Sequence, residues 1–144
     1  MQPSNTDQVA IQILGKEFLI NCPRESQPEL MTTAQLLDQR MKEIKARGKV
    51  FGLDRIAVMA ALNLLSELEG RKIAVLGDML ELGPYERQGH EIVGTRAAEV
   101  AKVLITLGAR AHIIAAAALK AGMQPGNTLE FTDIKDVTVW LQKN

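Results

Sequence analysis

The sequence has few of the residues on which disulfide, metal and aromatic chemistry depend. It contains one cysteine (Cys22) and two histidines (His90 and His112), which excludes a disulfide framework and a thiolate metal site. We interpret Cys22 as a small buried hydrophobe at the end of a strand. Aromatic residues make up only 3% of the chain and hydrophobic residues 47%, so the predicted core is aliphatic.

The chain also lacks an excess of charge and a long apolar run. Its 17 basic and 17 acidic residues cancel, which argues against a dedicated nucleic-acid binder. No stretch reaches the roughly 18 apolar residues of a membrane span. The first seven residues are polar and contain no apolar signal segment. We therefore expect a soluble, cytoplasmic protein without a metal, a cofactor or a membrane partner.

Hydrophobic alternation comes first along the chain. Apolar residues alternate over 9–13 and again over 18–22, and Gly15-Lys16 lies between the two runs. This pattern predicts a two-stranded hairpin, which Cys22-Pro23 ends. Ser26, with Glu29 three residues later, then predicts a capped helix that continues to Gly48. Its apolar residues follow helical spacing and form one stripe: Leu30, Ala34, Leu37, Met41 and Ile44.

A second predicted helix begins after Asp54, which we expect to cap it. The segment 56–68 is apolar on nearly every side of a helix. Such a helix requires burial from several directions, and a hairpin with one amphipathic helix cannot supply it. The covering surface must come from a partner subunit or from the second half of the chain.

The first half resembles the head domain of the ZapA family of cell-division proteins. The resemblance covers 8–66 and rests on several segments, Val9-Ala-Ile-Gln-Ile-Leu-Gly-Lys-Glu-Phe, Ile20-Asn-Cys-Pro, Leu36-Leu-Asp-Gln-Arg-Met-Lys-Glu-Ile-Lys and Gly48-Lys-Val-Phe-Gly-Leu-Asp-Arg-Ile-Ala-Val-Met-Ala-Ala-Leu-Asn. It implies a head at 1–69 that forms a homodimer, binds FtsZ filaments and has no catalytic activity. In the family the second helix continues into a coiled coil, and the resemblance stops near Glu69.

Basic residues concentrate between positions 40 and 55. They outnumber the acidic Glu43 and Asp54 and comprise Arg40, Lys42, Lys45, Arg47, Lys49 and Arg55. The segment is either a solvated helix face or a patch for an acidic partner. The family resemblance implies FtsZ as that partner, with contacts at Lys16 and Lys49 and with Asp54 close by.

The second half alternates strands and helices. Strands are predicted at 72–77, 103–108 and 128–131, and helices at 84–100, at 109–121 and after Asp133. This order predicts right-handed crossovers and a parallel sheet. The expected fold class is therefore α/β: a hairpin plus two helices, joined at about residue 70 to a truncated Rossmann-like domain at 70–144 with a three-stranded sheet and flanking helices.

Residues 60–144 resemble part of the C-terminal domain of the Mur ligases, most closely MurF. The carrying segments are Arg71-Lys-Ile-Ala-Val-Leu-Gly-Asp-Met-Leu-Glu-Leu-Gly and Gln88-Gly-His-Glu-Ile-Val-Gly. The family's ATP-binding domain has no counterpart here, and no Gly-x-x-x-x-Gly-Lys-Ser/Thr run is present. We therefore expect no ligase catalysis. Asp78 and Glu81 follow a strand and form either a ligand loop or a turn cap with a solvated charge. We interpret His90 as a helix-surface or packing residue and Trp140 as an anchor for the last helix.

Three functional hypotheses follow from the two resemblances. The chain is a ZapA-like interaction protein that dimerises and binds FtsZ. Alternatively, it is a fragment that binds a ligand of the peptidoglycan pathway through the loop 78–83. A third interpretation is a natural or engineered chimera without a cellular function, joined within helical sequence that both families share.

Overall fold

The computed structural model describes residues 6–80 and 82–144 and separates the chain into two compact units. The first unit is Met1–Lys49 and the second is Val50–Asn144. The sequence predicts a different boundary near residue 70, where the resemblance to one family gives way to the other. That junction stays a prediction. The second predicted helix belongs to the second compact unit.

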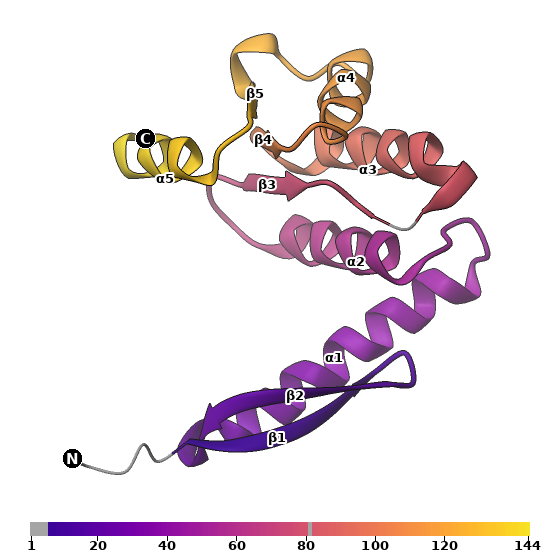
Figure 1. Cartoon of the computed structure of the whole chain (residues 1–144), viewed down its shortest axis with the longest axis vertical. Helices are drawn as coiled ribbons and strands as arrows, with labels where there is room; N and C mark the ends of the chain where they lie inside the picture. The colour runs from indigo at the N-terminus through magenta and orange to yellow at the C-terminus, as the bar shows by residue number, and fades with distance from the viewer. Residues whose placement is uncertain (1–5, 81) are drawn as a thin grey trace. The chain divides into compact units, whose positions relative to one another are not determined.

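A β-hairpin opens the first unit (Figure 1). Strand β1 (Thr6–Ile13) pairs antiparallel with β2 (Lys16–Pro23), and Ile13 lies opposite Lys16. Leu14 (φ 49°) and Gly15 (φ 77°) form the two-residue turn in left-handed backbone. Positive φ at both central residues is the geometry that matches the twist of a tight hairpin. The predicted hairpin is confirmed.

Helix α1 (Gln27–Ala46) packs against the hairpin, mainly against β1. It buries Ala34, Met41 and Ile44 on the predicted stripe. The predicted capping box at Ser26 is wrong, because the Ser26 side chain makes no capping hydrogen bond. A 3₁₀ turn, η1 (Arg24–Ser26), precedes α1, and the backbone N–H of Gln27 already donates to the Arg24 carbonyl. The chain is therefore helical before the expected cap position.

Helix α2 (Leu53–Glu67) opens the elements of the second unit. Its N-cap is Gly52 in left-handed backbone (φ 90°), so the predicted cap at Asp54 is wrong and Asp54 lies in the first helical turn. The helix packs against α3 (Glu86–Val100). Leu62 is 2% exposed and joins the core of the second unit. The second half of the chain thus supplies the cover that this apolar helix requires.

The sheet of the second unit has three parallel strands in the order β3-β4-β5, namely β3 (Ile73–Gly77), β4 (Val103–Leu107) and β5 (Thr128–Phe131). The helices between and after them are α3, α4 (His112–Lys120) and α5 (Ile134–Lys143), with short 3₁₀ turns η2 (Gly83–Tyr85) and η3 (Pro125–Asn127). The predicted order of elements is confirmed. The Rossmann-like assignment stays a prediction.

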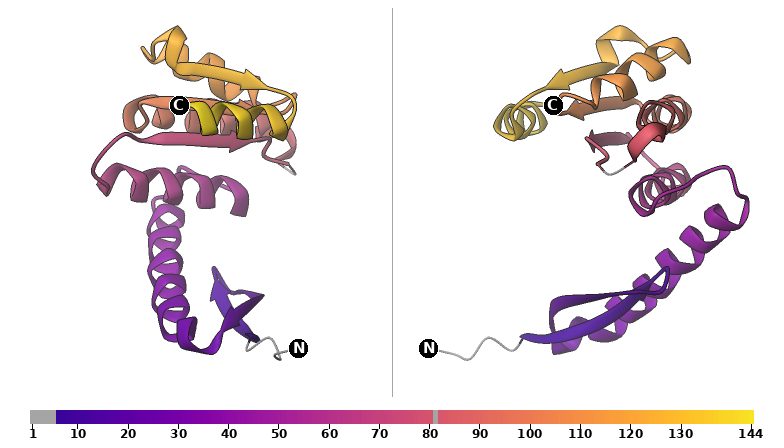
Figure 2. Two further views of the ribbon diagram at one scale, coloured as in Figure 1. Left: turned by 90° about the vertical axis from the view of Figure 1, so that its left-hand side faces the viewer. Right: turned by 45° about the vertical axis from the view of Figure 1, so that its right-hand side comes forward.

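Helices cover both faces of this sheet (Figure 2). The larger core cluster joins α2, α3 and α4 to one face through residues such as Leu104 and Ile114. On the other face, Val137 of α5 packs with Val103 and Ile105, and Trp140 packs against this cluster. Trp140 therefore anchors α5 as predicted. No aromatic residue is among the buried hydrophobic side chains of the described residues, so the aliphatic core is also confirmed.

Asp133 caps α5. The backbone N–H of Lys135 donates to the Asp133 carboxylate at 2.8 Å, which confirms the predicted cap of α5. Within the described part of the chain, no helix combines the length and the apolar character that crossing a membrane would require.

Candidate functional site

The hairpin turn carries Lys16 and is fixed to α1. Lys16 is exposed at the first position of β2. The preceding turn is held by Asp38 of α1, whose carboxylate accepts a hydrogen bond from the backbone N–H of Leu14 at 2.8 Å. Lys42, one helical turn later, forms an ion pair with the same carboxylate. Lys16 is therefore presented on a turn whose position relative to α1 is set by a hydrogen bond.

The charge state of Asp38 contributes to this arrangement. Hydrogen bonds from Lys42 and from the backbone of Leu14 lower the pKa of Asp38 below its ordinary value. Both interactions favour the charged carboxylate, so their contribution to stability is present above the pKa of the unfolded chain and is lost as the pH falls through the folded pKa. The link between turn and helix thus persists at neutral pH.

The basic segment 40–55 is only partly a solvent-facing patch. Lys45, Arg47 and Lys49 are exposed, and Lys42 is exposed but paired with Asp38. Arg55 is only 2% exposed, so its inclusion in the predicted patch is wrong. The sequence offered no sign of this, because a charged residue in the first turn of a helix is ordinarily solvated.

The structure separates Lys16 from Lys49. The turn before Lys16 contacts α1 at Asp38, and α1 continues to Ala46 before the chain reaches Lys49. At about 1.5 Å per residue, the helix rises roughly 12 Å between Asp38 and Ala46. These two lysines therefore occupy separate positions on the first unit, and their contact roles stay predictions. Asp54 is exposed in the second unit, and its role at a contact stays a prediction.

An uncovered apolar strand accompanies these charges. Phe18, Leu19 and Ile20 of β2 are 39%, 56% and 37% exposed. Successive strand residues point to opposite faces, so both faces of β2 carry exposed apolar side chains. Leu36 of α1 is also exposed, at 44%. Several exposed apolar side chains gathered on one strand make that strand a candidate for a protein–protein interface.

Asp78 in the second unit holds a loop. It follows β3, and its Oδ1 accepts hydrogen bonds from the backbone N–H groups of Arg110 and Ala111, at 2.9 and 2.7 Å. These groups precede α4. Gly108 lies against the same carboxylate, because a Cβ there would be 2.5 Å from Oδ1. The bonds match the turn-cap interpretation, and a ligand role for Asp78 stays a prediction. Glu81, its predicted companion, lies outside the described residues.

Replacing Asp78 with alanine tests the turn-cap interpretation. The N–H groups of Arg110 and Ala111 would lose their acceptor, and we expect a loss of roughly 1–2 kcal/mol in the free energy of unfolding. Urea unfolding followed by the fluorescence of Trp140 would measure it. Asp78→Asn keeps one acceptor oxygen and should lose less. A cost for Asp78→Ala no larger than that of the exposed Glu130→Ala would show that these bonds contribute nothing.

His90 is a packing residue in the core of the second unit. Its side chain is fully buried. Nε2 accepts a hydrogen bond from the backbone N–H of Met79 at 3.1 Å, and Nδ1 lies 2.7 Å from the carbonyl oxygen of Glu86. Both contacts are satisfied by the neutral ring with its proton on Nδ1. The ring thereby connects the segment after β3 to the first turn of α3.

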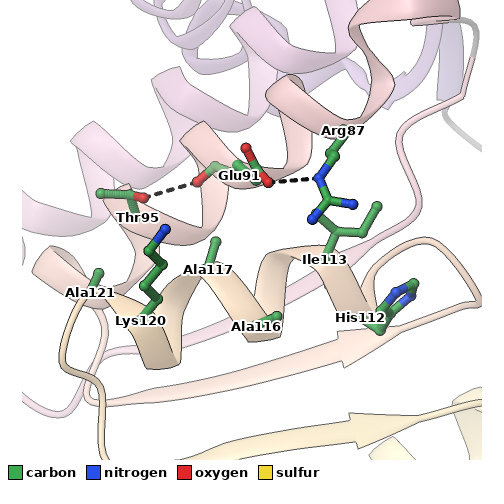
Figure 3. A pocket seen from close by; sticks show the side chains of 9 residues that line it. All are labelled: Arg87, Glu91, Thr95, His112, Ile113, Ala116, Ala117, Lys120 and Ala121. Atoms are coloured by element: carbon green, nitrogen blue, oxygen red, sulfur yellow. Dashed lines mark hydrogen bonds and ion pairs between the residues drawn. The ribbon is translucent and has the colours of Figure 1, made fainter.

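A groove of about 460 Å³ runs between α3 and α4 (Figure 3). Ala116 and Ala117 of α4 and its C-cap residue Ala121 line it with small side chains, while Lys120 and the Arg87–Glu91 ion pair add charge. Sequence reasoning did not predict it, because it depends on the spacing of two helices. Among the described residues, no group of three or more His, Cys, Asp or Glu side chains could hold a metal ion.

Comparison with known proteins assigns the chain to a family. The family profile described as "Cell division protein ZapA" matches residues 9–107, more than half of the chain. The chain is 50% identical over 72 residues to the "Cell division protein ZapA" of Pseudomonas aeruginosa, covering 50% of this chain and 67% of that protein. It is 37% identical over 65 residues to the protein of that name from Yersinia enterocolitica, covering 45% of this chain and 60% of the relative.

A solved structure was also matched. It is titled "Unknown conserved bacterial protein from Pseudomonas aeruginosa PAO1", is 50% identical, and is matched over 40% of this chain and 64% of its own, with a TM-score of 0.39. The chain thus spans about 60% to 67% of the length of these three proteins.

These matches place the chain among cell-division proteins. It belongs to the ZapA family. The family profile extends across the predicted junction at residue 70 to residue 107. The comparisons give no support to the Mur-ligase segment or to a chimera, and both stay predictions.

Proposed function

We propose that this chain is a non-catalytic division protein that forms a homodimer and binds FtsZ filaments through its first unit. The observation that carries the proposal is the coincidence of two kinds of surface. The hairpin and α1 expose a basic turn and an apolar strand within the half of the chain that resembles the family head.

The dimer is supported by the apolar surface of β2. Phe18, Leu19 and Ile20 each stay more than a third exposed, so apolar surface is left for a second copy to bury. Burial of apolar surface contributes roughly 25 cal/mol per Å². A second copy offers the same surface, and a two-fold interface brings such self-complementary patches together.

The filament contact is supported by Lys16 and Lys49. Both are exposed, and neither forms an ion pair with another of the described residues. Because α1 separates them, an acidic filament surface would meet two points of positive charge rather than one cluster. Two copies in a dimer would double these contact points, which is the arrangement needed to bridge two filaments.

Charge reversal tests this contact. Lys16→Glu combined with Lys49→Glu should weaken co-sedimentation with GTP-assembled FtsZ by about tenfold or more, because two attractions become repulsions. Lys102→Glu with Lys135→Glu makes the same change at exposed lysines of the second unit and should pellet like the original protein. Equal pelleting of the two double variants would remove Lys16 and Lys49 from the contact.

A further inference from the structure

The side chain of Arg55 is buried, and no described residue forms an ion pair with it. Arg55 is 2% exposed, and its Nε makes no hydrogen bond within the described part of the chain. Burial lowers the pKa of Arg55, because a desolvated cation is less stable than a hydrated one. Leaving a charged side chain buried and unpaired is strongly unfavourable in the absence of compensation. A buried and unpaired cation of this kind points to a compensating anion.

The surroundings of Arg55 add to its positive charge. It is the third residue of α2, whose N-cap Gly52 provides no side-chain acceptor. Its guanidinium lies over Gly89, the fourth residue of α3, where a Cβ would be 3.1 Å from Nε. The N-cap of α3, Tyr85, likewise makes no side-chain capping bond. Helix N-termini carry partial positive charge and favour anions.

Among the described residues, the carboxylates near Arg55 in the sequence or on α3 are paired elsewhere or exposed to solvent. Glu86, in the first turn of α3, forms an ion pair with Arg110 at 3.2 Å. Asp54 precedes Arg55 in the chain and is exposed, whereas Arg55 is buried. The first turns of α2 and α3 therefore lie near the Arg55 guanidinium, and none of the described residues places an anion among them.

We propose that Arg55, with the first turns of α2 and α3, forms a binding site for a small oxyanion of the phosphate class. The planar guanidinium presents N–H donors in a fork that matches two oxygens of such an ion. The guanidinium is already desolvated in the free protein, so binding the ion does not require its water to be removed again. The Leu82 side chain lies against both Gly52 and Gly89, with methyl carbons 3.3 and 2.8 Å from where a Cβ would stand at those positions, so we expect it to move when the ion binds. The site is independent of the proposed filament contact.

Titration of the whole chain with sodium phosphate tests the site, with sodium chloride at equal ionic strength as the reference. In ¹⁵N–¹H NMR spectra, the amides of Gly52 and Gly89 should shift and saturate with increasing phosphate. The Tm should rise by several degrees at saturating phosphate, because an ion that binds only the folded state stabilises it. Chloride at the same ionic strength should produce neither change.

Two variants make the test specific. Arg55→Met removes the guanidinium and an uncompensated buried charge, so it should fold and should lose the saturable shifts. Arg87→Met removes an exposed arginine that pairs with Glu91 and should keep them. Saturable shifts in the original protein and in Arg87→Met, but not in Arg55→Met, would support the proposal.

A third variant tests the carboxylate of Glu81. Glu81 adjoins Leu82, and Glu81→Gln removes its charge. The phosphate response should be at least as strong in Glu81→Gln as in the original protein. Absence of a saturable shift in the original protein would overturn the proposal. A shift seen only in Glu81→Gln would also overturn it, because it would identify this carboxylate as the occupant.

Discussion

Replacing Gly94 with alanine should destabilise the second unit by roughly 2–3 kcal/mol in the free energy of unfolding. Gly94 lies in α3 where that helix crosses α4, and a Cβ there would be 2.3 Å from the backbone oxygen of Ile114 and 2.8 Å from the Cβ of Ala117. A backbone carbonyl cannot rotate away as a side chain can, so the two helices would have to separate. The better helix propensity of alanine, about 1 kcal/mol, offsets only part of this cost.

Urea unfolding followed by the fluorescence of Trp140 measures this effect in the unit where it arises. Gly126→Ala is the matched control, because a Cβ at Gly126 meets no atom within 4 Å. The control should change the free energy of unfolding by less than about 1 kcal/mol. Equal stability of the two variants would mean that α3 and α4 do not approach each other this closely.

A second large effect is expected at the uncovered strand. The double substitution Phe18→Glu and Leu19→Glu places a charge on each face of β2, so it should weaken the proposed dimer by at least about a hundredfold. Both side chains are exposed within the first unit, at 39% and 56%, so its fold should survive. Sedimentation equilibrium would measure the association, and circular dichroism would confirm the secondary structure.

The matched control for this variant uses exposed apolar residues of the second unit. Leu119 and Val139 are 41% and 46% exposed. Leu119→Glu with Val139→Glu makes the same chemical change away from the hairpin and should leave the association unchanged. A similar loss of association in both variants would show that the dimer does not depend on β2.

Much of the fold could be predicted from local patterns. The alternation around Gly15-Lys16 identified the hairpin, and the apolar runs in the second half identified all three parallel strands. These patterns are reliable because the side-chain period of a strand and the apolar stripe of a helix are set by the backbone itself. The cap at Asp133 could also be predicted, because it joins residues only two positions apart in the sequence.

The failures have two causes: the local backbone path into a helix, and contacts between segments far apart in the sequence. Ser26 and Asp54 are good capping residues by type, but the backbone enters α1 through a 3₁₀ turn and enters α2 through Gly52. Arg55 was assigned to a solvated patch because its burial depends on Gly89, 34 positions later, having no side chain. The link from Asp38 to the hairpin turn and the groove between α3 and α4 likewise depend on tertiary packing.

For the candidate contact residues Lys16 and Lys49, one property could be predicted from the sequence and another could not. Exposure of Lys16 and Lys49 was predictable, since lysine in a turn or loop is ordinarily solvated. Their separation along α1 was not predictable, because it depends on the hairpin turn lying beside Asp38 rather than near the end of the helix. The family resemblance suggested the proposed partner, and the structure gave the spacing of the two candidate lysines.

The solution mass of the whole chain tests the proposed function most directly, because bridging filaments requires at least two contact surfaces in one particle. Light scattering on a sizing column should give twice the 15.8 kDa mass of the chain at micromolar concentration. A mass of 15.8 kDa under the same conditions would contradict the dimer and, with it, the proposal that this chain bridges FtsZ filaments.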